Sequence, residues 1–132
     1  MTLNIRVIAP DRTVWDANAE EVILPSSTGQ LGILTGHIPL LTALDIGVMR
    51  VRIDKDWVPI VLMGGFAEID NNKITILVNG AEETIDIDIS LAQKNLEEAT
   101  SQLTQAISTK DKIEATQNMR KARARLQGTA II

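Results

Sequence analysis

Cysteine and tyrosine are absent from this 132-residue sequence, and histidine occurs once, as His37. Without cysteine the chain has no disulfide, no thiol nucleophile and no zinc ribbon. A single histidine rules out a histidine-rich metal site and leaves little for a Ser–His–Asp triad, so His37 is interpreted as a hydrogen-bonded structural residue. We therefore expect no catalytic residue, no metal site and no cofactor in this chain.

Aromatic residues are nearly as scarce, at 2% of the chain, and they are Trp15, Trp57 and Phe66. Proteins that bind single-stranded nucleic acid stack the bases on aromatic side chains, so this function is essentially excluded. The net charge of −4 also argues against general affinity for DNA or RNA. Because 45% of the residues are hydrophobic, as in ordinary globular proteins, we expect a core built from aliphatic side chains.

Long apolar runs are missing as well. No segment approaches the roughly 18 consecutive apolar residues of a membrane-spanning helix, and the N-terminus has no apolar stretch of signal-peptide length. The chain itself is therefore expected to be soluble. Its length is sufficient for one compact domain with an appendage.

The first 84 residues carry the pattern of short β-strands. Strand-like runs, alternating or continuously apolar, occur at 3–7, 21–24, 48–53, 57–63 and 73–78. Turn-forming residues separate these runs at 10–11, 26–29, 45–47, 54–56 and 70–73. Short strands at this spacing predict an all-β sandwich or barrel. Pro59 inside a run indicates an edge position or a bulge.

From about Ser90 the apolar residues recur in steps of three and four, which predicts two amphipathic helices. The two stripes are Ala92, Leu96, Ala99, Leu103 and Ala106, then Ala115, Met119, Ala122 and Leu126. Ser90 with Gln93, and Asp111 with Glu114, have capping-box spacing at the two starts, and Gly128 is placed to end the second helix. The short connection at 107–110 predicts an antiparallel hairpin. We therefore divide the chain into a β-sandwich domain, 1–84, and a two-helix domain, 85–132.

The predicted hairpin has two further properties. Its apolar stripes are rich in alanine and bury little area, so the hairpin is expected to be only marginally stable and weakly docked, and able to come away from its parent domain. Residues 110–125 hold six basic side chains and two acidic ones, which indicates an acidic partner. A solvated helix face is the alternative interpretation. The basic cluster is Arg120, Lys121, Arg123 and Arg125.

Nothing in the sequence has the pattern of an active site. Carboxylates are plentiful, but they occur at turns or in exposed positions such as 20–21 and 82–83, whereas acid–base catalysis needs a buried pair of differing acidity. The Gly64-Gly65 pair lacks the Lys-Ser/Thr ending of a phosphate-binding loop and is interpreted as a bulge or a close backbone contact. The chain is therefore expected not to be an enzyme.

The most distinctive segment is 28–44, where three glycines permit tight bends and Pro39 fixes the entry to the next strand. Its two motifs, Gly29-Gln30-Leu31-Gly32-Ile33 and Gly36-His37-Ile38-Pro39-Leu40-Leu41, resemble the signature of the epsilon subunits of F-type ATP synthases. The resemblance covers the whole chain, including 13–16, 62–67, 74–78 and the helical tail. Segments 12–16 and 63–67 look most like the chloroplast and cyanobacterial branch.

The resemblance implies a non-catalytic rotor subunit whose sandwich grips the foot of the gamma shaft and rests on the c-ring. It implies that the hairpin can rise toward the catalytic head of alpha and beta subunits and inhibit ATP hydrolysis. It also implies a peripheral membrane protein on the cytoplasmic or stromal side of the thylakoid membrane. By the same resemblance, the residues facing the c-ring are Gly29, Gln30 and Leu31, and those facing gamma are Ala9, His37 and Thr42.

One motif departs from the family pattern. Many bacterial members carry Ile/Leu-Asp-x-x-Arg-Ala near the start of the first helix, and the motif is linked to ATP binding. The matching residues here include Asp88 and Ala92, but Leu91 stands in place of the arginine and supplies no phosphate donor. Lys121 and Arg125 still match basic positions of the second helix. We therefore expect ATP binding by this vestigial motif to be weak at best.

Two other classes of function stay open at the level of the sequence. One is a β-sandwich adaptor with a coiled-coil tail in a different assembly, which binding to gamma and the c-ring would discriminate. The other is a nucleotide-binding sensor, which titration with ATP would discriminate.

Overall fold

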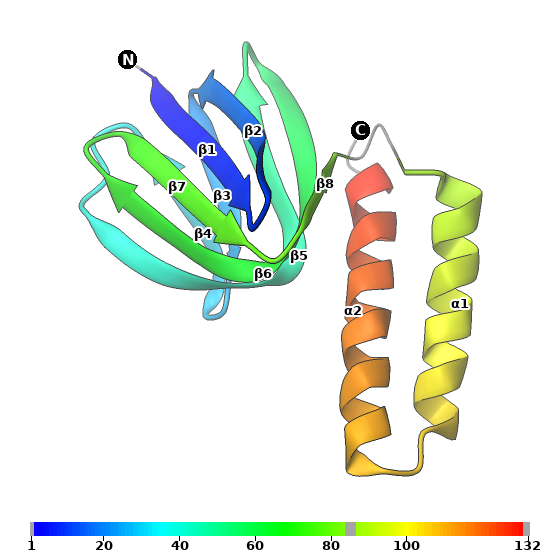
Figure 1. Ribbon diagram of the computed structural model, residues 1–132. Helices are drawn as coiled ribbons and strands as arrows, with labels where there is room; N and C mark the ends of the chain where they lie inside the picture. The colour runs from blue at the N-terminus through cyan, green and yellow to red at the C-terminus, as the bar shows by residue number, and fades with distance from the viewer. Residues whose placement is uncertain (1, 84–86, 131–132) are drawn as a thin grey trace.

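The computed structural model describes residues 2–83 and 87–130, which form eight strands followed by two helices (Figure 1). The predicted β-sandwich with a C-terminal pair of helices is confirmed. The expected domain boundary after residue 84 lies outside the described residues. The strands are β1 Leu3–Ala9, β2 Arg12–Ala19, β3 Glu21–Ser26, β4 Gly29–Leu34, β5 Leu40–Ile53, β6 Asp56–Asp70, β7 Lys73–Val78 and β8 Ala81–Glu83.

The strands form one continuous sheet in the order β2-β1-β7-β6-β5-β3-β4, with β8 paired to β6. Neighbouring strands are antiparallel except β1 and β7, which run parallel. The sheet folds over itself into two layers, with β1 and β7 facing β3 and β4 across the interior (Figure 1). The enclosed core is aliphatic, as expected. Its largest fully buried side chains include Leu3, Ile5, Leu24, Ile33, Met49, Ile60, Leu62, Ile69, Ile74 and Ile76.

The long strands β5 and β6 take part in both layers. In β6 the core residues are Ile60 and Leu62 in one half but Ala67 and Ile69 in the other, so the buried positions pass from even to odd numbers. β5 shows the same change between Leu44 and Met49. Because side chains alternate strictly along a regular strand, both strands must be distorted between these positions.

Gly64 and Gly65 form this distortion in β6. Their φ angles are +86° and +153°, values that favour glycine. A Cβ atom on Gly65 would lie 2.0 Å from the carbonyl oxygen of Leu77 in the neighbouring strand β7. The prediction of a close backbone contact at this glycine pair is confirmed.

Two local predictions have different outcomes. The expected turn at 45–47 is wrong, because these residues continue β5 opposite the glycine pair, where the strand bends without reversing. Pro59 lies where β6 pairs with Arg50 of β5 and has no registered partner among the described residues on its other side. This is a local edge, which a residue without a backbone N–H tolerates, as expected.

The two helices are α1 Ile89–Gln105 and α2 Thr109–Ala130, and they pack antiparallel against each other (Figure 1). The alanine stripe of the sequence is confirmed as the buried seam, with Ala92 and Ala99 in α1 and Ala115 and Ala122 in α2.

The helix ends differ slightly from those predicted. Asp88, not Ser90, caps α1, because its Oδ1 accepts a hydrogen bond from Leu91 N at 3.1 Å. At the second start the backbone N–H of Asp111 donates to Ser108 Oγ at 3.1 Å. A capping oxygen must lie two or three residues before the N–H that it accepts from, so both starts lie earlier than the capping-box spacing indicated. Gly128 does not end α2, which continues to Ala130.

Candidate functional surfaces of the sandwich and the hairpin

The β3–β4 hairpin presents the residues expected to face a c-ring. Ser26 pairs with Gly29 across a two-residue turn, and Ser26 Oγ accepts a hydrogen bond from Thr28 N at 3.2 Å. The φ angle of +125° at Gly29 closes this turn. Gly29 and Gln30 are exposed at the tip, whereas Leu31 is half-buried against the core.

The tip of this hairpin is tied to β5. The hydroxyls of Ser26 and Thr42 lie 3.3 Å apart, and Ser27 N donates to the carbonyl of Ala43 at 3.0 Å. Ser26 is only 6% exposed. The exposed tip is therefore held on a rigid base that includes Thr42.

The three residues expected to face gamma are not gathered in one place. Ala9 ends β1, just beyond the pairing of Ile8 with Leu77 at the far end of β7. His37 lies at the opposite end of this layer, in the β4–β5 loop that Gly36 N anchors to Asn72 Oδ1 at 2.7 Å. Thr42 lies in β5 between these ends.

His37 itself has a structural contact. Its Nδ1 lies 2.6 Å from the carbonyl oxygen of Ile38, and its backbone N–H donates to Leu34 O at 3.2 Å. Both contacts help to shape the loop, which agrees with the interpretation of His37 as a hydrogen-bonded structural residue.

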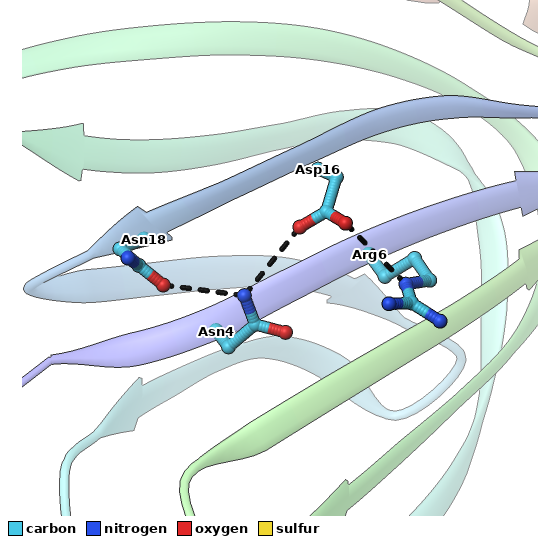
Figure 2. A network of polar contacts seen from close by, with 4 residues as sticks. All are labelled: Asn4, Arg6, Asp16 and Asn18. Carbon is cyan, nitrogen blue, oxygen red and sulfur yellow. Dashed lines mark hydrogen bonds and ion pairs between the residues drawn. The ribbon is translucent and has the colours of Figure 1, made fainter.

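The outer face of the β1–β7 layer carries a polar network at one end (Figure 2). Asp16 accepts a hydrogen bond from Asn4 Nδ2 at 3.4 Å and pairs with Arg6 Nε at 3.5 Å. Asn4 also donates to Asn18 Oδ1 at 3.2 Å. These contacts are exposed, so each contributes only a few tenths of a kcal/mol.

An apolar row crosses the same outer face beside this network. Strand pairing places Ile8 next to Leu77, Leu77 next to Phe66, and Phe66 next to Ala43. Phe66 is 56% exposed and Leu77 is 52% exposed. Sequence reasoning missed this row. The available signal was an apolar residue on the outward, otherwise polar side of each strand.

The hairpin contacts the sandwich through α2, which lies against β5 and β6, while α1 packs on the other side of α2 (Figure 1). Ala124 is 2% exposed although it lies opposite the buried seam, and Gly128, one turn later, is also buried. Val61 of β6 is fully buried yet lies outside the main core cluster. We infer that this small-residue side of α2 covers Val61.

Within the described residues, two ion pairs connect α2 to the sandwich. Arg125 Nε lies 2.6 Å from Glu82 Oε2 in β8, and Arg120 Nη2 lies 3.7 Å from Asp45 Oδ2 in β5. Sequence reasoning missed Asp45 and Glu82 as docking residues, because each is an unremarkable carboxylate far along the chain from its arginine.

The four basic residues of the predicted cluster therefore have different roles. Successive residues of a helix point about 100° apart, so positions 120, 121, 123 and 125 cannot share one narrow face. Arg123 donates to Met119 Sδ at 3.2 Å within its own helix. Among the described residues, neither Arg123 nor Lys121 has an ion pair with a carboxylate.

A groove of about 440 Å³ lies between the start of α1 and the sandwich. It contains the vestigial motif residues Asp88, Leu91 and Ala92, together with Arg125. Leu91 is 55% exposed there, and Asp88 is engaged in capping α1. The charged lining residues are Arg12, Arg125, Glu82, Glu83 and Asp88. Acidic groups outnumber basic ones in this lining, so the groove is poorly suited to a polyanion such as a nucleoside triphosphate.

Within 2–83 and 87–130, no group of three or more His, Cys, Asp or Glu side chains is arranged to hold a metal ion. Over the same residues, neither helix has the length and apolar character needed to cross a membrane.

Family comparisons cover nearly the whole chain. Residues 2–84 match the family described as ATP synthase, Delta/Epsilon chain, beta-sandwich domain. Residues 86–128 match the long alpha-helix domain of the same chains.

Among curated relatives, the chloroplastic ATP synthase epsilon chain of Porphyra purpurea is 76% identical over 96% of this chain and 95% of its own length. The corresponding chain of Gracilaria tenuistipitata var. liui is 73% identical over 100% and 98%. The ATP synthase epsilon chain of the cyanobacterium Thermosynechococcus vestitus is 62% identical over 96% and 94%.

Solved structures share the fold at low sequence identity. A chain of the Euglena gracilis mitochondrial ATP synthase, in a structure of OSCP/F1/c-ring, has a TM-score of 0.84 at 19% identity, covering 99% of this chain and 82% of its own. A chain of the Tetrahymena thermophila central stalk/c-ring structure has a TM-score of 0.68 at 14% identity, covering 98% and 97%.

Proposed function

Because the chain belongs to the family of ATP synthase epsilon chains, we propose that it couples the gamma shaft to the c-ring in the central stalk and restrains ATP hydrolysis through its hairpin. An epsilon chain is a non-catalytic structural subunit of the ATP synthase complex. The chemistry of ATP synthesis therefore takes place on other subunits, and the role of this chain is mechanical.

The apolar row of Ile8, Leu77, Phe66 and Ala43, in which Leu77 and Phe66 are exposed, carries the proposal of coupling. An apolar centre flanked by polar groups is the usual composition of a protein–protein interface. Here the flanking groups are Asn4, Arg6, Asp16 and Asn18 (Figure 2), and the charges of Arg6 and Asp16 already pair with each other. We propose that gamma covers this face.

The β3–β4 tip supports the second contact of the coupling role. Gly29 and Gln30 are exposed on a turn that is hydrogen-bonded to β5, so a load on the tip passes into the body of the sandwich. We propose that this tip, with Leu31 behind it, rests on the c-ring. Ala9, His37 and Thr42 would then mark the extent of the gamma contact along the layer.

The proposal of regulation follows from how little holds the hairpin. Among the described residues, α2 makes the main contact with the sandwich, through small residues and two ion pairs, so the free energy difference between docked and raised positions is expected to be small. In a raised position the basic side chains of α2 would meet carboxylates of the alpha and beta subunits. Residues 1–84 and 85–132 would thus act as two units, a rotor-binding head and a movable brake.

The proposed location follows from the photosynthetic relatives. We place the chain at the thylakoid membrane, on its stromal or cytoplasmic side, as a peripheral subunit held there by gamma and the c-ring. An adaptor of another assembly would bind neither partner.

Reconstitution with the remaining ATP synthase subunits tests both halves of the proposal. Three enzymes are compared, with the full chain, with residues 88–132 deleted and without the chain, and both proton pumping and ATP hydrolysis are measured. Coupling by the sandwich predicts that the deleted form restores proton pumping. Restraint by the hairpin predicts faster ATP hydrolysis by the deleted form than by the full chain. Equal hydrolysis rates would refute the brake, and absence of pumping with a bound sandwich would refute the coupling role.

A further inference from the structure

The hairpin is docked by a short contact at the end of α2. Arg120, Ala124 and Gly128 are spaced by four residues and lie along the side of α2 that meets the sandwich. The first turns of α2 and the loop before it extend beyond the sandwich, and Ile107 in that loop is 90% exposed (Figure 1). Because alanine and glycine bury little apolar surface, burial alone holds this contact weakly.

The two ion pairs at this contact differ in quality. The Arg125–Glu82 pair has a 2.6 Å hydrogen bond and side chains that are 33% and 37% exposed. The Arg120–Asp45 pair is longer, at 3.7 Å, and its side chains are 38% and 49% exposed. A short, partly buried, charge-assisted hydrogen bond is stronger than an exposed pair without one. The Arg125–Glu82 pair therefore contributes the larger share.

This stronger pair lies in the groove that also contains the vestigial ATP motif. The Nε atom of Arg125 already donates to Glu82, and Leu91 offers no charge to a ligand on the α1 side. Glu82 thus already accepts the hydrogen bond that Arg125 would otherwise donate to a phosphate group.

We propose that the Arg125–Glu82 ion pair is a built-in latch that holds the hairpin against the sandwich without a bound ligand. The Arg120–Asp45 pair is a second, weaker attachment point. The inference rests on the proposed function only for its regulatory meaning, because docking is a property of the free chain. Release of the latch is the step that frees α2 to move toward another partner.

Distances between the tip and the sandwich test the latch in the full chain. The native sequence has no cysteine, so Asp11→Cys in the exposed β1–β2 turn and Ile107→Cys at the hairpin tip give two unique positions for spin labels. Pulsed electron paramagnetic resonance then measures the distribution of distances between the two labels. This distribution is expected to be narrow in docked chains and broad in undocked chains. Tryptophan fluorescence, from Trp15 and Trp57 in the strands, verifies that the sandwich stays folded.

Glu82→Gln keeps the shape of the side chain and removes its charge. The ratio of undocked to docked chains is expected to rise about fivefold, within the range for a charged hydrogen bond that is partly exposed to water. Glu83→Gln is the matched control, because it removes a neighbouring carboxylate that has no ion pair among the described residues. The double exchange Glu82→Arg with Arg125→Glu should restore most of the docked population.

Salt and nucleotide give the latch two further signatures. Raising sodium chloride from about 0.05 M to about 0.5 M should undock the wild type measurably and Glu82→Gln much less, because salt screens the charges of the pair. ATP at about millimolar concentration, with or without Mg²⁺, should leave the docked fraction unchanged. A docked fraction that is equal in Glu82→Gln and wild type, or one that ATP increases, overturns the latch.

The same variants separate this inference from the proposed function. If Glu82→Gln undocks the free chain but leaves ATP hydrolysis of the assembled enzyme unchanged, the latch stands and the brake fails. If deletion of residues 88–132 accelerates hydrolysis but Glu82→Gln does not change docking, the brake stands and the latch fails.

Discussion

Replacing Gly65 with alanine tests whether the distortion in β6 determines the stability of the whole sandwich. The added Cβ would lie 2.0 Å from Leu77 O and 2.8 Å from Val78 Cα. Both are backbone atoms of β7, which cannot turn aside as a flexible side chain would. The residue would also keep a φ angle near +153°, where side chains other than hydrogen are strained.

The expected cost is large compared with the stability of the domain. Backbone strain of this kind costs about 1–3 kcal/mol, and forcing an extra methyl group into a packed site costs about 1–3 kcal/mol more. A domain of this size has a total free energy of unfolding of about 4–12 kcal/mol. Gly65→Ala should therefore lower the melting temperature of the sandwich by at least about 10 °C. At the upper end of this cost the sandwich would fail to fold.

Alanine substitutions at two other glycines distinguish the cost of the steric clash from the cost of backbone strain. Gly36 has a φ angle of +84° but open space around its Cβ position, so Gly36→Ala should cost about 1 kcal/mol from strain alone. Gly32 has open space and is not in the positive-φ region, so Gly32→Ala should change stability by less than about 0.5 kcal/mol. Denaturant melts followed by tryptophan fluorescence report on the sandwich, because Trp15 and Trp57 both lie in its strands. A midpoint for Gly65→Ala as high as that of Gly32→Ala would refute the reasoning.

Three further predictions concern the two parts of the chain. Residues 1–84 expressed alone should fold, with modest stability, and co-purify with gamma. An unfolded head would contradict the division into two domains, and a folded head that never binds would contradict rotor binding without the tail. Calorimetric titration should detect no ATP binding at low micromolar concentration, because a missing charged contact weakens affinity about ten- to a hundredfold, and Leu91→Arg should strengthen it. Tight saturation of the native chain would show this expectation to be mistaken. Changing all four residues of the basic cluster to alanine should accelerate ATP hydrolysis by the reconstituted enzyme with assembly unchanged. Changing Lys121 and Arg123 alone should accelerate it too, since neither takes part in the docking pairs, and an unaltered rate in both variants would reduce the cluster to a solvated surface.

The sequence predicted the strands of the interior better than those at the edges. The runs in β1, β3, β6 and β7 are apolar enough to be recognised, and the change of period near Ser90 located the helices. By contrast β2, β4 and β8 are not among the predicted strands. β4 contains two glycines, β2 is mostly polar and exposed, and β8 has three residues. Each pairs along one side only, so its pattern reflects the surface more than the core.

The candidate site was predictable in its motifs but not in its contacts. The departure at Leu91 could be read from the sequence, and so could the concentration of basic residues in α2. The partner of Arg125 could not, because Glu82 is 43 residues away and only the three-dimensional packing brings the two together. The pairing of Arg120 with Asp45 could not be predicted either, because local turn preferences placed Asp45 in a reversal of the chain.

The course of β5 and β6 through both layers has a mechanical consequence. Layers that meet only through side chains can slide over each other under load, because dispersion contacts re-form after each small step. Here a twisting force applied to one layer is carried to the other along two continuous backbones, whose covalent bonds do not yield. The head of this chain is therefore built as a stiff torsional element.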